Sequence, residues 1–170
     1  LASEAATRIK ANSQLVRTAA LYHDIGKMDN APFFTENQNK VNPHDKLTPQ
    51  ESAAIIVGHV EKGIALADKF GLPESIKGFI ASHHGKGVAR YFYIKYAQDH
   101  PDSAPDPLDF SYPGPNPYSK ETAILMMADA VEAASRSLKE YTEDSIAELV
   151  DKIIDTQVSE GYFMDCPINW

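Results

Sequence analysis

Six side chains of the kinds that bind transition metals stand within or at the ends of apolar helical patterns. They are His23, Asp24, His59, His83, His84 and Asp129. The first two are adjacent in sequence, and Gly26 and Lys27 follow almost at once. Adjacent residues on a helix point about 100° apart, so His23 and Asp24 can reach one metal cluster only from a helix end or a bend. Burying such a pair is costly unless it is hydrogen-bonded or metal-bound.

Imidazoles and carboxylates together are the ligand set of zinc, manganese or iron, and calcium prefers oxygen ligands alone. A single histidine on a helix is more often a structural residue than a ligand, so the prediction rests on the six residues occurring together. Four imidazoles and two carboxylates exceed what one tetrahedral ion needs. The sequence therefore predicts a cluster of two metal ions bridged by Asp24.

The first part of the chain is predicted to place His23 and Asp24 at the end of a helix. Residues 1–10 have helical composition, and Asn12 or Ser13 is expected to cap a second helix. On that helix the apolar residues share one face with His23, Asp24 and Lys27, so all of them are expected to point the same way. Residues 28–46 are polar and rich in asparagine, and we expect them to form a long, mobile loop.

The rest of the chain is predicted to form five more helices. They cover residues 48–71, 73–84, 90–100, 119–138 and a last stretch from 142 onward. Thr48 and Glu51 are expected to form a capping box at the first of these. Residues 101–117 contain six prolines and are expected to form a loop without regular structure. No alternating strand pattern occurs, so we predict an all-α bundle of six or seven helices, a single domain over residues 1–170.

Charge and composition narrow the class of ligand. The net charge of −8 argues against a nucleic-acid polymer as partner, because such a partner requires a basic face. An anionic substrate would need a bound metal for local positive charge. One cysteine, Cys166, excludes an internal disulfide, and no apolar stretch reaches the length of a membrane span. The chain opens at Leu1 without a methionine, so we expect a fragment whose first helix is truncated on its N-terminal side.

Several long motifs resemble a known family. The segment His23-Asp24-Ile25-Gly26-Lys27 resembles the signature of the HD-domain metal-dependent phosphohydrolase superfamily. The rest of the sequence is similar to the cytosolic HD domain of membrane-anchored, seven-transmembrane HD hydrolases. These are the PgpH-like phosphodiesterases that cleave cyclic di-AMP. The matching stretches are NPHDKLTPQESAAIIVGHV at 42–60, HHGKG and RYFY within 83–93, and GPNPYSKETAILMMADAVEAASRSL at 114–138.

The resemblance implies two divalent ions, iron or manganese. His23, Asp24 and Asp129 would hold one ion; Asp24, His59, His83 and His84 would hold the other. The family's first histidine precedes the segment that corresponds to Leu1, so the first ion is expected to lack one ligand here. The resemblance also implies a parent protein embedded in the bacterial membrane, with this domain on the cytoplasmic side and a sensor domain upstream. It implies no oligomeric state.

The implied reaction is hydrolysis of cyclic di-AMP to the linear dinucleotide pApA. Asp24 would act in catalysis as the bridging ligand, and Lys27 would contact the scissile phosphate as a point charge. Arg136 lies seven residues after Asp129, on the same helical face, and is a candidate phosphate contact. Tyr93 is a candidate for stacking on an adenine. The structural alternative for Arg136 is a surface ion pair, and the structural alternative for Tyr93 is a position in the apolar core.

Three other functions remain open. An HD hydrolase could act on another cyclic dinucleotide or nucleotide, although His83-His84 is followed by Gly-Lys-Gly-Val-Ala and not by the Gly-Tyr-Pro of the cyclic di-GMP branch. A non-catalytic HD module could bind nucleotide and signal without cleaving it. A purely structural helical module would carry no transition metal.

Overall fold

The computed structural model describes residues 1–38 and 41–168. Over these residues the chain forms α-helices and short 3-10 helices and no strand. Val88 and Ser111 form one isolated antiparallel bridge. The α-helices are α1 (Ala2–Arg8), α2 (Ser13–Tyr22), α3 (Pro49–Val57), α4 (His59–Lys69), α5 (Glu74–Ser82), α6 (Arg90–Asp99), α7 (Lys120–Ser135) and α8 (Glu143–Ser159). The 3-10 helices are η1 (Ile25–Phe33), η2 (Thr35–Asn37), η3 (Pro43–Lys46) and η4 (Pro107–Phe110). The all-α class is confirmed, and no helix in the described ranges could cross a membrane.

The helix starts follow the sequence. The Asn12 side chain accepts a hydrogen bond from the Leu15 backbone N–H and caps α2. Capping boxes begin α3 at Thr48, α7 at Ser119 and α8 at Thr142. In each box a side chain accepts from the backbone N–H three residues on, and that residue's side chain accepts in return. Such local bonds satisfy the N–H groups that the first turn of a helix leaves unpaired.

Two predicted helices end early, and this corrects the expected arrangement. The helix expected over residues 48–71 is broken at Gly58, so eight α-helices replace the expected six or seven in the described part of the chain. The second helix ends at Tyr22, and Asp24 has φ −105° and ψ 13°. His23, Asp24 and Lys27 therefore do not share a face of α2. The break at Gly58 puts His59 at the first residue of α4.

The segment predicted to be a long loop is more regular than expected. Within residues 28–46, η1 continues to Phe33 and is followed by η2 and η3, and positions 39 and 40 lie outside the described residues. Asn42 accepts from the His44 backbone N–H and caps η3. Asp106 caps η4 in the same way, inside the proline-rich stretch 101–117. In both places a proline occupies the first position of the turn, where its missing N–H costs nothing.

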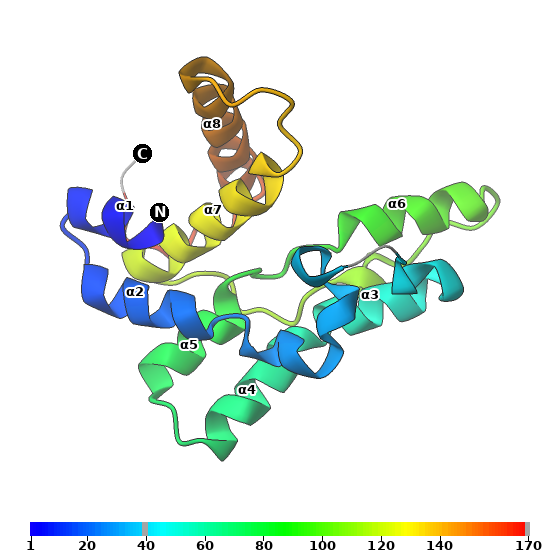
Figure 1. The fold of residues 1–170 in the computed structure, drawn as a ribbon, viewed down its shortest axis with the longest axis horizontal. Coiled ribbons are helices and arrows are strands. Elements are labelled where there is room, and N and C mark those ends of the chain that lie inside the picture. Colours follow the sequence, from blue (N-terminus) through cyan, green and yellow to red (C-terminus); the bar gives the residue numbers. More distant parts are fainter. Residues whose placement is uncertain (39–40, 169–170) are drawn as a thin grey trace.

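Three apolar clusters form in the described part of the chain. The smallest packs Ala123 and Met126 of α7 against Phe163; the other two contain more buried residues. The larger joins α1, α2, α5 and α7 around buried residues such as Val16, Phe79 and Ile80. The second joins α3, α6 and η4 around Phe92 and Phe110. Figure 1 shows α3 and α6 side by side, apart from the helices of the larger cluster. The ends of α2 and α5, the start of α4 and the middle of α7 bring the six candidate ligands together.

Candidate metal centre

Three histidines are held by the same local hydrogen bond. The Nδ1–H groups of His23, His59 and His83 each donate to the carbonyl oxygen three residues earlier, at 3.0, 2.5 and 2.8 Å. A carbonyl can only accept, so the proton of a neutral ring lies on Nδ1 and the Nε2 lone pair is free. This bond fixes both the tautomer and the ring orientation, as it does for metal-binding histidines in general.

The free nitrogens converge on one carboxylate oxygen. His59 Nε2 lies 3.1 Å from His83 Nε2. Asp24 Oδ1 lies 3.4 Å from the first and 3.6 Å from the second. Together with His84, these residues offer four ligand atoms within 4.8 Å of one another. Two lone pairs at 3.1 Å repel unless a proton or a cation lies between them, so the chemistry of this donor set fits a metal ion.

A second group shares the same aspartate. His23 Nε2 lies 3.2 Å from Asp24 Oδ2 and 3.4 Å from Asp129 Oδ1. These three residues again offer ligand atoms within 4.8 Å of one another. Asp24 thus presents one oxygen to each group. His23 Nε2 and Asp24 Oδ1 are buried and have no hydrogen-bond partner among the described residues, as expected of atoms placed to bind a metal.

Burial and mutual charge set the protonation of this cluster. Burial alone would lower the pKa of His23, but contacts with Asp129 and Asp24 outweigh it and raise this pKa to about 10. Burial would raise the pKa of the Asp24 carboxyl, but its histidine neighbours hold that pKa far below the ordinary range. Burial lowers the pKa of His83 and of His84. Those two rings are therefore neutral near pH 7, the form that binds metals.

We expect metal binding to release a proton from His23. In the metal-free protein His23 keeps this proton up to about pH 10. The contacts of protonated His23 with Asp129 and Asp24 therefore stabilise the metal-free fold fully below the ordinary histidine pKa. This stabilisation is lost as the pH rises through 10. A metal at His23 has to displace the proton, so metal affinity there should rise about tenfold per pH unit up to that pH. Titration calorimetry in buffers of different ionisation enthalpy measures the release. The His23→Gln variant is the control, and release that is unchanged in it contradicts the assignment.

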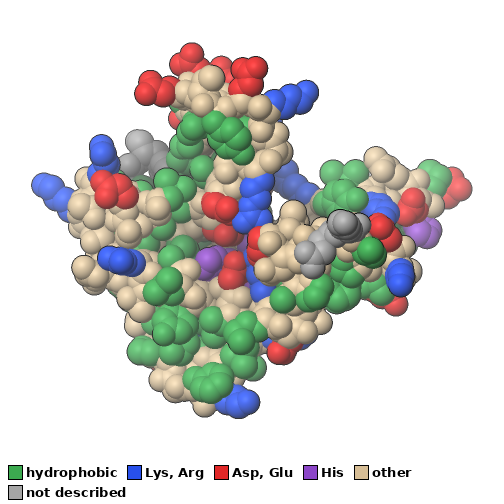
Figure 2. Space-filling model, in the orientation of Figure 1, with side chains coloured by type: hydrophobic (Ala, Val, Ile, Leu, Met, Phe, Trp, Pro, Cys, Tyr) green, Lys and Arg blue, Asp and Glu red, His purple; other side chains and the backbone are tan. Residues whose placement is uncertain are grey.

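A cleft of about 500 Å³ opens over the cluster. Figure 2 shows acidic, basic and histidine side chains gathered in the hollow at the centre of one face. Asp24, Glu36, Asp129 and Glu132 line this cleft, and they outnumber its two cationic side chains, Lys27 and Arg136. Without a metal the cleft is therefore a poor place for a phosphate, and two divalent ions would reverse its charge.

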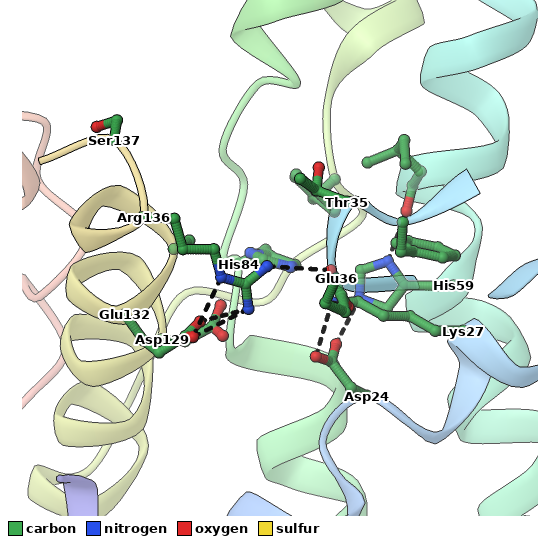
Figure 3. Close-up of a pocket in the computed structure, with 14 residues that line it drawn as sticks. Asp24, Lys27, Thr35, Glu36, His59, His84, Asp129, Glu132, Arg136 and Ser137 are labelled. Carbon is green, nitrogen blue, oxygen red and sulfur yellow. Dashed lines mark hydrogen bonds and ion pairs between the residues drawn. The ribbon is translucent and has the colours of Figure 1, made fainter. Parts of the chain in front are cut away.

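A chain of ion pairs crosses the cleft. Lys27 Nζ lies 2.8 Å from both Asp24 Oδ2 and Glu36 Oε1. Arg136 reaches the other oxygen of Glu36 at 3.5 Å and Glu132 at 2.8 Å. Figure 3 shows these contacts running from Glu132 on α7 across to Asp24. Both cations thus point into the space where an anionic ligand would lie.

The structure brings together all six predicted ligands, and Lys27 and Arg136 line the same cleft. Tyr93, the candidate for stacking on an adenine, is the one predicted site residue outside both the ligand groups and this cleft. Its ring packs edge to face against Phe110, with centroids 5.7 Å apart, in the second apolar cluster. Tyr93 is not among the residues that line the cleft. The apolar alternative is therefore the one that the packing favours.

Sequence reasoning missed Tyr112 and Glu36. The Tyr112 ring stacks on His84 with centroids 4.3 Å apart and planes at 28°. Burial raises the pKa of Tyr112, so its phenol stays protonated. Tyr112 follows η4 in the proline-rich stretch, and Glu36 lies in η2; neither segment has a helical pattern that would mark a face. No sequence signal distinguishes either residue from its neighbours.

Comparison with known proteins agrees with this geometry. The HD-domain family profile matches residues 1–134. The chain belongs to the HD-domain family. Over 99% of its length this HD domain is 42% identical to the cyclic-di-AMP phosphodiesterase PgpH of Listeria monocytogenes, and it is 38% identical to the protein of that name from Bacillus subtilis. The solved HD domain of L. monocytogenes PgpH in complex with cyclic-di-AMP superposes with a TM-score of 0.93 at 41% identity, over 99% of this chain and 78% of that one.

The HD domain described here spans 23% of the Listeria protein and 24% of the Bacillus protein. Divalent-metal binding is the chemistry of this family, and the His and Asp cluster is able to hold a metal.

Proposed function

We propose that this HD domain hydrolyses cyclic di-AMP to the linear dinucleotide pApA with two divalent ions, iron or manganese. One observation carries the proposal: two groups of ligand atoms share Asp24 at the base of a charged cleft. The relatives named as cyclic-di-AMP phosphodiesterases support the choice of substrate. The cytoplasmic side of a bacterial membrane, with an anchored parent protein and an upstream sensor domain, is part of the same proposal.

The residues of the chain have separate tasks in this reaction. His23, Asp24 and Asp129 would hold one ion, and His59, His83 and His84 would hold the other together with Asp24. When bound, two divalent ions supply a hydroxide nucleophile near neutral pH and offset charge on the phosphate. Lys27 would donate to a non-bridging phosphate oxygen and stabilise the charge that grows in the transition state. Burial would lower the pKa of Lys27, but Asp24 and Glu36 outweigh it and raise this pKa, so the ammonium is charged at neutral pH.

Arg136 is proposed to bind the second phosphate of the cyclic dinucleotide. Its guanidinium lines the cleft and is 40% exposed, so it can exchange Glu36 for a ligand phosphate. Arg136→Ala should raise KM for cyclic di-AMP about 3- to 10-fold and change kcat little, because the contact lies away from the reacting phosphorus. Steady-state kinetics measures both constants. Arg17→Ala removes an exposed arginine on α2 and should change neither; a lower kcat with unchanged KM for Arg136→Ala contradicts this role.

The proposed activity is tested by loading the protein with manganese or iron and offering cyclic di-AMP and cyclic di-GMP side by side. We expect pApA as the product, and loss of the activity when a chelator removes the metal. Faster cleavage of cyclic di-GMP would favour the second substrate class. Binding of cyclic di-AMP without turnover by the fully metal-loaded protein would favour a non-catalytic signalling module. If the protein binds no transition metal, a purely structural helical module would be favoured.

A further inference from the structure

One histidine of the metal cluster is held differently from the others. The rings of His23, His59 and His83 each donate a hydrogen bond to the carbonyl oxygen three residues earlier. The ring of His84 has no such bond, and no other group in the described part of the chain is hydrogen-bonded to it. His84 is also only half-buried, whereas His59 and His83 are 1% exposed. The bond that usually orients a metal-binding imidazole is therefore not what orients this ring.

A neighbouring ring orients His84 instead. The Tyr112 ring stacks on it with centroids 4.3 Å apart and planes at 28°. His84 also contacts the rings of His83 and His59, but these planes are inclined to it at 44° and 85°. Tyr112 thus supplies the flat surface against which the imidazole lies. Such a contact fixes the plane of the imidazole, because rotating the ring would lose the stack and push its edge into the phenol.

The position of Tyr112 is itself fixed by backbone hydrogen bonds to the loop after α5. Its N–H donates to the Gly87 carbonyl oxygen at 2.8 Å, and the Ala89 N–H donates to the Phe110 carbonyl oxygen at 2.8 Å. Phe110 is 1% exposed in the second apolar cluster, so this segment cannot shift without opening that cluster. Pro113 follows Tyr112 and restricts its backbone to extended conformations. The phenol and the histidine that it covers therefore lie on two segments that are bonded to each other.

We propose that Tyr112 is a positioning residue of the metal centre, whose ring holds the His84 imidazole in the orientation that binds metal. The inference rests on the two-metal centre of the proposed function and gives the proline-rich stretch a part in it. Groups that orient a metal-bound histidine commonly contribute about 10- to 100-fold to metal affinity. The stack uses the face of the ring and not its hydroxyl, so a phenylalanine would serve equally well.

The test measures the binding of cobalt(II) to the metal-free protein by its visible absorption. Tyr112 also lines the cleft, so leaving nucleotide out separates its effect on the metal from any contact with a substrate. Tyr112→Ala should weaken the affinity for one of the two ions about 10- to 100-fold and leave the affinity for the other nearly unchanged. Tyr112→Leu fills the space without a flat face and should weaken the same ion, even where its Tm equals that of the wild type. Tyr112→Phe should bind both ions as the wild type does.

Two further variants separate positioning from stability. Tyr96→Ala removes a tyrosine that stacks on His100 with centroids also 4.3 Å apart, outside the cleft and both ligand groups. It should change neither affinity. His84→Ala removes the ligand itself, so adding Tyr112→Ala to it should weaken binding no further, whereas residues that act independently have additive effects.

The outcomes separate this role from the proposed activity. Unchanged affinities in Tyr112→Ala and Tyr112→Leu overturn the positioning role and leave the proposed hydrolysis standing. An equal loss in Tyr112→Phe also overturns it, because the hydroxyl would then be the group that acts. So does a further loss when Tyr112→Ala is added to His84→Ala, because the tyrosine would not act through that histidine. If the wild-type protein binds two cobalt ions but does not cleave cyclic di-AMP, the proposed function fails, and the affinities of the Tyr112 variants still decide the positioning role.

Discussion

Asp24→Ala is expected to lower turnover of cyclic di-AMP by at least about 10³-fold and to remove both bound metals together. The two oxygens of Asp24 face different groups, one toward His59 and His83 and the other toward His23. No other carboxylate in the described residues belongs to both groups. Metal ions contribute several kcal/mol to the transition state of such reactions, and each 1.36 kcal/mol is a factor of ten in rate. Metal analysis and steady-state kinetics on the same preparation measure the two effects.

Asp24→Asn separates charge from shape at this position. The amide keeps the size of the side chain and loses its negative charge, so its metal content should also fall. Asp151→Asn removes an exposed carboxylate on α8 and should change neither metal content nor rate. Turnover that survives in Asp24→Ala, or one metal that stays tightly bound per chain, would contradict the bridging role.

Gly26→Ala is expected to destabilise the fold and to disrupt the metal centre at once. Gly26 lies where η1 crosses α4, and a Cβ there would overlap the Gly63 backbone nitrogen and the His59 carbonyl oxygen. Both neighbours are backbone atoms, which cannot turn aside as a side chain can. Overpacking of this kind costs about 3 kcal/mol, the upper end of the usual range. For a chain of this size that lowers Tm by about 6–12 °C.

Metal affinity should fall because the two crossing segments carry ligands of the metal centre. Asp24 immediately precedes η1, and His59 begins α4, so separating the segments pulls these two side chains apart. Gly71→Ala is the matched control, because Gly71 has φ +66° but open space around its Cβ position. It should cost about 1–2 kcal/mol of backbone strain and leave metal binding intact. Equal effects of both variants on metal affinity would show that the close approach at Gly26 has no special role.

Local sequence determined the all-α class and the starts of α2, α3, α7 and α8. Thr48 with Glu51, Ser119 and Thr142 cap helices at the predicted positions, because a capping bond joins residues only three apart and needs no distant partner. The six candidate ligands were also readable, since their residue types are few and their chemistry is distinctive. The HD motif at residues 23–27 added the division of those ligands into two groups, which the geometry matches.

Tertiary structure alone decided where two of the helices break or end and which distant side chains come into contact. The break at Gly58 and the early end of α2 turn His59 and Asp24 toward each other, and no local pattern marks either change. Tyr112 reaches His84 from the proline-rich stretch, and Tyr93 turns away into the apolar cluster around Phe110. The pairing of Glu36 with Arg136 joins residues 100 positions apart. Contacts at such separations depend on how the helices pack, and a periodic pattern records which face is buried but not which partner it meets.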